Sequence, residues 1–354
     1  MNHFRAATTA IAAALLLAVA QAHAAERDRA PLVMEEMMLP SPDPAGMQIY
    51  VRNKHPADLT SFSPERTVLF VHGATYPAET AFDLKLGGFS WMDYIAERGF
   101  DVFLVDLPGY GKSTRPPEMD QPADKNPPLI NTETAVKNVG AVVDMILAKR
   151  HVAKLDLIGW SWGTTIMGTY TARNNAKVNR LVLYAPVWIA EGASPFPPNV
   201  PAYRLVTKEA ALKRWLTGVP EAKQGDLIPK GWFDAWANAT WATDPESAKK
   251  DPPALRAPNG VIADFKDIWF AGKSTYDPAQ IDVPVLLVQA EWDADTPPYM
   301  ARKLFSLLTN TPFKRYVLIG EGTHTVVMEK NRLQLFRAVQ DFLFEHAPVK
   351  AASR

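Results

Sequence analysis

The most informative segment of the chain is Leu155-Asp156-Leu157-Ile158-Gly159-Trp160-Ser161-Trp162-Gly163. An apolar run of strand length leads into a serine that has glycine two positions before it and two positions after it. Residues 164–173 then form a stretch of helix length. Glycine at both positions lets the chain reverse sharply from strand to helix and present the serine hydroxyl above a sheet. Ser161 is therefore the candidate nucleophile.

Along the rest of the chain, apolar runs of strand length alternate with amphipathic stretches of helix length. This alternation is typical of an α/β fold, in which a mostly parallel central sheet carries helices on both faces. Compact apolar runs predict strands buried on both faces, whereas Met47 to Val51 alternates like an early edge strand. The predicted buried strands are 67–71, 102–105, 155–158, 181–184, 285–289 and 316–319, and the predicted helices are 88–98, 132–149, 164–173, 298–308 and 333–344.

The alternation is interrupted at residues 187–281, which we interpret as an inserted helical cap between two parts of one core, 25–186 and 282–354. Helix-like stretches occur at 207–217 and 231–242. The insertion is rich in tryptophan: Trp188, Trp215, Trp232, Trp236, Trp241 and Trp269. Each of these rings either packs in the cap's own core or faces the cleft below it, and we expect some to face the cleft.

The first 24 residues have the pattern of a secretory signal peptide. Arg5 precedes an apolar run from Ala10 to Ala20, and Ala22-His23-Ala24 forms a small-x-small cleavage site. The run is too short to span a membrane, although an uncleaved anchor is the alternative interpretation. We therefore expect an exported protein, periplasmic or secreted, without stable membrane anchoring after cleavage.

Composition narrows the classes of partner. Lys plus Arg equals Asp plus Glu, at 38 each, and no long run of one sign occurs, so the charge pattern does not favour nucleic acid. The chain has no cysteine, which excludes disulfides, a thiol nucleophile and cysteine metal ligands. A small molecule is the expected partner.

A serine hydroxyl needs a general base to accept its proton, and imidazole is suited to that role at neutral pH. His324 lies in a glycine-rich loop, Gly320 to His324, between a late strand and the last helix. The carboxylate that orients the histidine should follow a strand and precede the histidine. Asp293 and Asp295 both qualify, and we favour Asp293 because Asp295 is well placed to cap the next helix.

The oxyanion of a tetrahedral intermediate needs two hydrogen-bond donors. The backbone N–H of Trp162, directly after the candidate nucleophile, would supply one. The loop His72-Gly73-Ala74-Thr75-Tyr76 follows an early strand, so the N–H of Ala74 would supply the second. The aromatic side chains of Tyr76, Trp160 and Trp188 are candidates for substrate binding.

Taken together, these motifs resemble those of the α/β-hydrolase superfamily, and the resemblance runs from about Met47 to the C-terminal helix. It rests on His72-Gly73, the loop from Asp106 to Ser113, the turn at Ser161, and the acid and histidine loops. In relatives the loop corresponding to 106–113 is structural. The turn is similar to that of proline iminopeptidases, but those enzymes have a more glycine-rich oxyanion loop. Serine at the nucleophile position argues against dehalogenases and epoxide hydrolases, while carbon–carbon bond hydrolases and cofactor-free haloperoxidases stay open.

The resemblance implies an α/β-hydrolase fold and acyl transfer from an ester or lactone through Ser161, with no metal or organic cofactor. An aromatic cap over a serine suits an apolar or aromatic substrate. Two alternatives remain at this point: an exported aminopeptidase or amidase, and a non-catalytic homologue that only binds a ligand. The first would need acidic cap residues to hold a substrate amine, for which the candidates are Glu191, Glu209, Glu221, Asp226 and Asp234.

Overall fold

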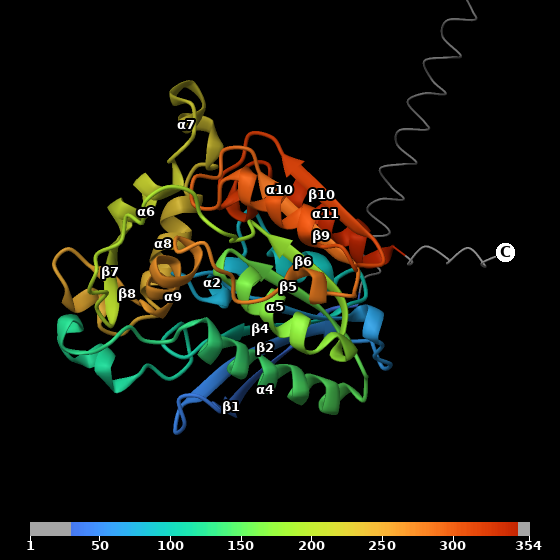
Figure 1. The fold of residues 1–354 in the computed structure, drawn as a ribbon. Coiled ribbons are helices and arrows are strands. Elements are labelled where there is room, and N and C mark those ends of the chain that lie inside the picture. Colours follow the sequence, from blue (N-terminus) through green and yellow to red (C-terminus); the bar gives the residue numbers. More distant parts are fainter. Residues whose placement is uncertain (1–29, 346–354) are drawn as a thin grey trace, which may run out of the picture.

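Eight strands form one sheet in the order β1-β2-β4-β3-β5-β6-β9-β10 (Figure 1). The computed structural model describes residues 30–345, so the predicted signal peptide lies outside the described residues. The strands are β1 (Leu32–Pro40), β2 (Gln48–Pro56), β3 (Thr67–Val71), β4 (Asp101–Asp106), β5 (Leu155–Trp160), β6 (Val178–Tyr184), β9 (Val285–Ala290) and β10 (Lys314–Ile319). β1 and β2 pair antiparallel with their neighbours and the remaining pairs are parallel. The structure confirms the predicted α/β-hydrolase fold with its mostly parallel sheet.

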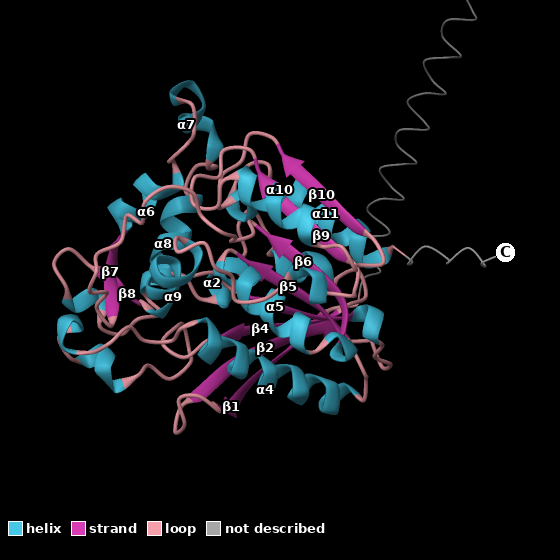
Figure 2. Cartoon of the chain, viewed as in Figure 1, coloured by secondary structure: helices cyan, strands magenta, loops and turns pink. Residues whose placement is uncertain are grey.

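Helices cover both faces of the sheet (Figure 2). They are α2 (Ala78–Phe82), α3 (Trp91–Ala96), α4 (Thr132–Arg150), α5 (Trp162–Arg173), α10 (Pro298–Leu307) and α11 (Arg332–Phe344). Alternate residues of each buried strand point to opposite faces. In β3, Val68 and Phe70 join a core with residues of α2, α3 and α11, whereas Leu69 and Val71 join a core with residues of α4, α5 and α10.

The structure corrects two predictions for the part of the chain before β4. The strand expected at Met47 to Val51 is longer, and β1 covers it, so β2 is not the edge strand. The helix expected at 88–98 is shorter and begins only at Trp91, because Ser90 caps it: the Ser90 side chain accepts a hydrogen bond from the Asp93 N–H, and the Ser90 N–H donates one to the Asp93 carboxylate.

The inserted segment between β6 and β9 contains more than the expected helices. It holds α6 (Lys208–Trp215), α7 (Glu221–Leu227), α8 (Trp232–Trp241) and α9 (Gly260–Asp264), followed by a π-helical turn, Phe265–Trp269. It also contains an unexpected antiparallel pair, β7 (Tyr203–Thr207) and β8 (Ala254–Pro258). In Figure 1 these elements gather on the left side of the sheet. No helix among residues 30–345 is long and apolar enough to cross a membrane.

Candidate active site

The turn at Ser161 joins β5 directly to α5, and it holds the serine in an unusual backbone conformation. The φ and ψ angles of Ser161 are 57° and −122°, a region that residues with a side chain rarely adopt. The two flanking glycines make this turn possible. A Cβ at Gly159 would lie 2.3 Å from the carbonyl oxygen of Gly163, and one at Gly163 would lie 2.4 Å from that of Val71. Any larger residue would push the turn away from β3.

His324 pairs with Asp293. Its Nδ1 lies 2.9 Å from Oδ2 and 3.1 Å from Oδ1 of that carboxylate, which is buried in the loop after β9. The same carboxylate accepts hydrogen bonds from the N–H groups of Asp295 and Thr296, from the Thr296 hydroxyl and from the side-chain amide of Gln289. These donors fix the carboxylate, and the carboxylate in turn fixes the imidazole ring.

The charges around His324 set its proton affinity. Burial lowers the pKa of His324, but the negative charges of Asp293 and Asp295 outweigh burial, and Arg214 opposes them only in part. The pKa of the imidazole is therefore held above its usual value of about 6.5.

Asp295 does not cap the helix that follows it, so that prediction was wrong. α10 begins at Pro298 without a side-chain cap. Asp295 instead pairs with Arg214 of α6, whose Nε lies 2.9 Å from each carboxylate oxygen. The misassignment arose because helix-start signals are local in sequence, whereas this partner lies 81 positions earlier.

Trp160 holds the loop that carries His324. Its indole N–H donates a 3.0 Å hydrogen bond to the main-chain carbonyl of His324, and the hydroxyl of Tyr184 donates a 2.6 Å bond to the same oxygen. The rings of Trp160 and Tyr184 are stacked, with centroids 5.8 Å apart. Trp160 also lines the pocket described below, but its polar group is used to place the histidine.

The loop from His72 to Tyr76, which is predicted to supply an oxyanion donor, is held in place by hydrogen bonds that its main-chain carbonyl groups accept from side chains. The Leu107 N–H donates to Nε2 of His72 at 3.1 Å, so Nδ1 carries the proton and donates to the Gly73 carbonyl at 2.7 Å. Burial lowers the pKa of His72 to about 4, which keeps the ring neutral. Because the peptide unit is planar and trans, holding the Gly73 carbonyl also fixes the direction of the Ala74 N–H.

The next peptide unit of this loop is held from the inserted segment. The Ala74 carbonyl accepts a 2.7 Å hydrogen bond from Nη2 of Arg204, on β7, and a 2.9 Å bond from the Tyr110 hydroxyl. The loop lies against the serine, since a Cβ at Gly73 would be 3.0 Å from the Cβ of Ser161. Trp162 is the first residue of α5, where backbone N–H groups have no intrahelical acceptor.

The loop from Asp106 to Ser113 makes buried contacts within the core. The Asp106 carboxylate accepts hydrogen bonds from the N–H groups of Ala78 and Lys112, at 2.7 and 3.1 Å, and burial raises its pKa to about 6. A Cβ at Gly111 would overlap this carboxylate, at 1.9 Å from Oδ2. The loop therefore packs as a structural connection.

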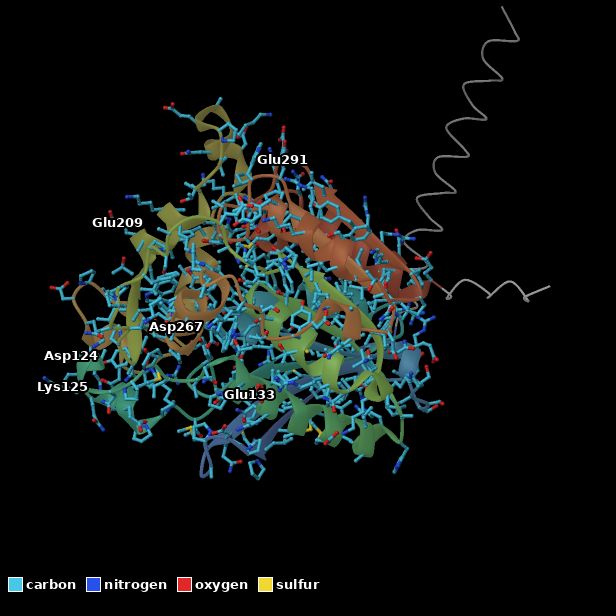
Figure 3. The ribbon with its side chains drawn as sticks, viewed as in Figure 1. Asp124, Lys125, Glu133, Glu209, Asp267 and Glu291 are labelled. Carbon is cyan, nitrogen blue, oxygen red and sulfur yellow. The ribbon has the colours of Figure 1, made fainter. Side chains whose placement is uncertain are left out.

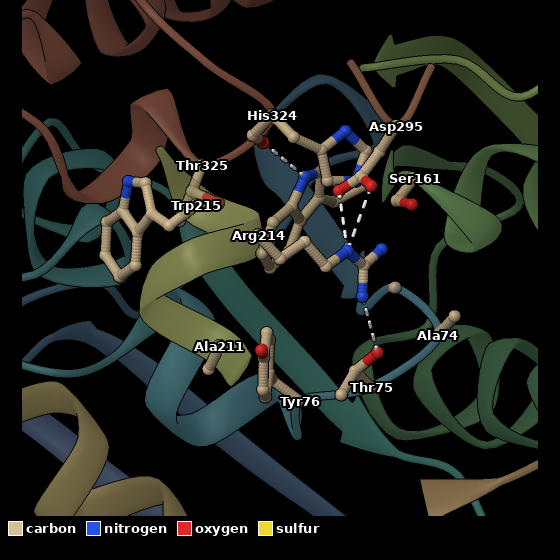
Figure 4. A pocket seen from close by; sticks show the side chains of 12 residues that line it. Ala74, Thr75, Tyr76, Ser161, Ala211, Arg214, Trp215, Asp295, His324 and Thr325 are labelled. Atoms are coloured by element: carbon tan, nitrogen blue, oxygen red, sulfur yellow. Dashed lines mark hydrogen bonds and ion pairs between the residues drawn. The ribbon is translucent and has the colours of Figure 1, made fainter. Parts of the chain in front are cut away.

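Ser161 and His324 line one pocket between the core and the inserted segment (Figure 4). Gly73, Ala74, Thr75 and Trp160 contribute from the core. The remaining lining residues are Tyr76, Ala211, Arg214, Trp215, Asp295 and Thr325. Of these six, Tyr76 was a predicted substrate-binding residue and Asp295 was the second candidate for the orienting carboxylate. Trp215 was one of the tryptophans of which some were expected to face the cleft. Arg214 carries no motif that would have singled it out.

Trp188 is not among the residues lining this pocket. Its ring is buried in the core and packs edge-on against Tyr276, with centroids 5.5 Å apart. Among the tryptophans of the insertion, Trp215 lines the pocket. Its indole N–H donates to the buried Glu329 at 2.8 Å. Trp236 and Trp241 pack against each other in the insertion, with centroids 5.8 Å apart.

The comparisons with known proteins agree with this architecture. A family model described as alpha/beta hydrolase fold matches residues 66–331. The search of curated proteins found no match.

Several solved structures share the fold at low sequence identity. A serine hydrolase involved in carbazole degradation is 17% identical, with 88% of this chain and 99% of that chain covered and a TM-score of 0.57. A 2-hydroxy-6-oxo-6-phenylhexa-2,4-dienoate hydrolase from Rhodococcus sp. strain RHA1 is 16% identical, with 88% and 99% covered and a TM-score of 0.57. A thermophilic esterase from Thermogutta terrifontis is 16% identical, with 87% and 98% covered and a TM-score of 0.53.

Proposed function

Because the chain belongs to the alpha/beta hydrolase fold family, we propose that it is a serine hydrolase that cleaves a carboxylic ester or lactone through an acyl-enzyme. Ser161 is the nucleophile, His324 the general base and Asp293 the carboxylate that orients the base. The observation that carries the proposal is the shared pocket of Ser161 and His324, with the His324 Nδ1 2.9 Å from Asp293.

The reaction proceeds in two halves. The Ser161 hydroxyl attacks the substrate carbonyl while its proton passes to Nε2 of His324, and the N–H groups of Ala74 and Trp162 stabilise the oxyanion. His324 gives that proton to the departing alcohol oxygen as the carbon–oxygen bond breaks. Water then attacks the acyl-enzyme, its proton passes to His324, and the acid leaves as Ser161 regains a proton.

The charged groups of the pocket favour an ester over a peptide substrate. An aminopeptidase needs a free acidic group for the substrate amine, and none of the five acidic candidates of the insertion is among the residues that line the pocket. Glu209 points outward at the edge of the molecule (Figure 3), and Glu191 pairs with Lys303. Asp295 lines the pocket but is paired with Arg214.

Export is part of the proposal, and it rests on the sequence of residues 1–24 alone. If a signal peptide is removed, the mass of the protein purified from its producing cells should correspond to a chain that begins after Ala24. An intact N-terminus on protein recovered from the membrane fraction would instead support the alternative, in which residues 1–24 remain as an uncleaved membrane anchor.

Mass spectrometry of the purified protein after treatment with a fluorophosphonate tests the chemistry, beside the Ser161→Ala variant. We expect one covalent adduct at Ser161 that the variant lacks, together with turnover of short aryl esters such as phenyl acetate. Matched aminoacyl anilides should react far more slowly, and the reverse order would favour the amidase alternative. A folded protein with neither label nor turnover would point to a ligand-binding homologue.

A further inference from the structure

Ser161 lies at the junction of two hollows. The first is the pocket described above, which we call the histidine hollow because His324, Trp160 and Thr325 line it. The second, which we call the phenylalanine hollow, is lined by Phe196, Phe265 and Phe270, among others. Both hollows share four lining residues: Ala74, Ser161, Arg214 and Asp295. The Arg214–Asp295 ion pair therefore stands where the two spaces meet at the serine.

The phenylalanine hollow is the larger and the more apolar space. Counting the space that is open to solvent, its volume is about 1020 Å³, compared with about 420 Å³ for the histidine hollow. Phe196 packs against Phe265 and Phe270, with ring centroids 5.9 and 6.1 Å apart, and all three rings are only half-buried. Ile262 and Met300 extend this surface. A bound apolar group would remove these exposed aromatic faces from water, which is favourable in proportion to the covered area.

The position of the imidazole determines which half of an ester belongs in which hollow. Nδ1 of His324 faces the Asp293 carboxylate, which only accepts hydrogen bonds, so Nδ1 carries a proton and Nε2 exchanges protons with the reactants. The alcohol oxygen of an ester must receive its proton from Nε2 as it leaves. His324 lines the histidine hollow and is not among the residues of the phenylalanine hollow.

We infer that the phenylalanine hollow binds the acyl group and that the histidine hollow admits the alcohol, so that the preferred substrates are esters of a bulky apolar acid with a small alcohol. This inference rests on the proposed serine hydrolase function. It assigns Phe196, Phe265, Phe270 and Ile262 as residues that determine acyl specificity.

Two isomeric esters give a direct test, because they have the same atoms with the bulk on opposite sides. Methyl 3-phenylpropanoate carries the phenyl group on the acid, and 2-phenylethyl acetate carries it on the alcohol. We expect kcat/KM, measured by acid release at constant pH, to be at least about 30-fold higher for the methyl ester, equivalent to about 2 kcal/mol of transition-state discrimination. Ratios near one, or a preference for the acetate, would overturn the assignment.

Ile262→Trp fills the phenylalanine hollow at a half-buried position. It should lower kcat/KM for methyl 3-phenylpropanoate at least about tenfold, because an apolar pocket that no longer fits its substrate typically loses about this much. The value for methyl acetate should stay within about threefold of the wild type. Leu307→Trp is the matched control, at a position of α10 that is 43% exposed. It should leave kcat/KM for both methyl esters unchanged. Equal losses on both methyl esters would contradict an acyl site.

The proposed function and this inference fail in different ways. Without fluorophosphonate labelling and phenyl acetate turnover in the wild-type protein, the proposed function itself falls. With both present, absence of turnover of either isomer, or no acyl preference between them, overturns the assignment of the hollows alone.

Discussion

The Nε of Arg214, on α6 of the inserted segment, lies 2.9 Å from both carboxylate oxygens of Asp295, on the loop after β9. A second nitrogen of the same guanidinium donates to the Thr75 hydroxyl at 3.3 Å (Figure 4). The side chain of Arg214 is 42% exposed, so this ion pair lies where solvent reaches the pocket. The pair thus links the insertion to two loops of the core beside the proposed catalytic groups.

Replacing Arg214 should shift the pH dependence of catalysis. Arg214 lowers the pKa of His324, so Arg214→Met should raise that pKa and move the acidic limb of the kcat/KM profile to higher pH. Because the side chain is partly exposed, solvent screens its charge, and we expect a shift of less than about one pH unit. Lys213→Met, a neighbouring exposed cation on α6, is the control and should leave the profile in place. A shift to lower pH would contradict this electrostatic role.

Asp293→Asn and Asp295→Asn should differ greatly in turnover. An amide at position 293 cannot hold the imidazole in the required tautomer, and in related triads such a change lowers kcat on the order of 10⁴-fold. Asp295→Asn removes the ion pair with Arg214 and one of the two negative charges that raise the pKa of His324, but it leaves the bond between Asp293 and His324, and we expect a loss of less than about tenfold. Steady-state kinetics on one aryl ester compares the two directly. The opposite ranking would assign the orienting role to Asp295.

Arg204→Lys should impair the oxyanion loop without removing a charge. Arg204 donates hydrogen bonds to the Ala74 carbonyl, the Thr75 hydroxyl, the Pro258 carbonyl and the Asn259 side chain, a geometry that an ammonium group does not reproduce. Loss of an oxyanion donor costs about 10²–10³-fold in kcat, so a misplaced donor should cost at least about tenfold.

The readout for Arg204→Lys is the division of the effect between kcat and KM on a short aryl ester. If Arg204 only positions the oxyanion loop, kcat should fall while KM stays within about threefold of the wild-type value. Tyr110→Phe, which removes the other donor to the Ala74 carbonyl, should show a smaller loss of the same kind. An increase in KM alone would indicate that Arg204 contacts the substrate instead.

The buried Glu329 should make stability depend on pH. Burial raises its pKa to about 7, from an ordinary value of 4.5, although Thr323 and Trp215 donate hydrogen bonds to the carboxylate. The folded state therefore binds this proton more tightly than the unfolded state. The resulting stabilisation is present in full below pH 4.5 and is lost as the pH rises through about 7.

Thermal unfolding of the wild-type protein and of Glu329→Gln, whose side chain cannot titrate, measures the stabilisation that comes from the proton on Glu329. The Tm of the wild type relative to the variant should be higher at pH 5 than at pH 8. The corresponding difference in the free energy of unfolding should be on the order of 3 kcal/mol or less. A difference that is independent of pH would show that the carboxyl does not change its charge over this range.

The sequence predicted the parts of the fold whose signals are local. Buried strands such as β3 are continuous apolar runs, and the turn at Ser161 depends on glycines two residues away. β1 was missed because it lies at the sheet edge, where Glu35 and Glu36 interrupt the apolar pattern. β7 and β8 were missed because each pairs only with a strand about fifty residues away in sequence.

The site shows the same division between local and distant signals. The sequence singled out Ser161, His324 and Asp293 as candidates because each belongs to a short motif that follows a strand. Arg204 and Arg214 reach the site by tertiary packing of the insertion, and no neighbouring residue marks them. Trp188 was predicted to bind substrate because it follows a core strand, as the residues of the pocket do. Its ring instead packs in the core against Tyr276.

The backbone conformation of Ser161 has a consequence for protein engineering. A residue with a side chain held at φ 57° and ψ −122° costs about 1–3 kcal/mol that glycine would not incur. Selection of variants for heat resistance alone would therefore reward Ser161→Gly, which relieves the turn and deletes the proposed nucleophile. Any directed-evolution programme on this scaffold would have to select for turnover and thermostability together.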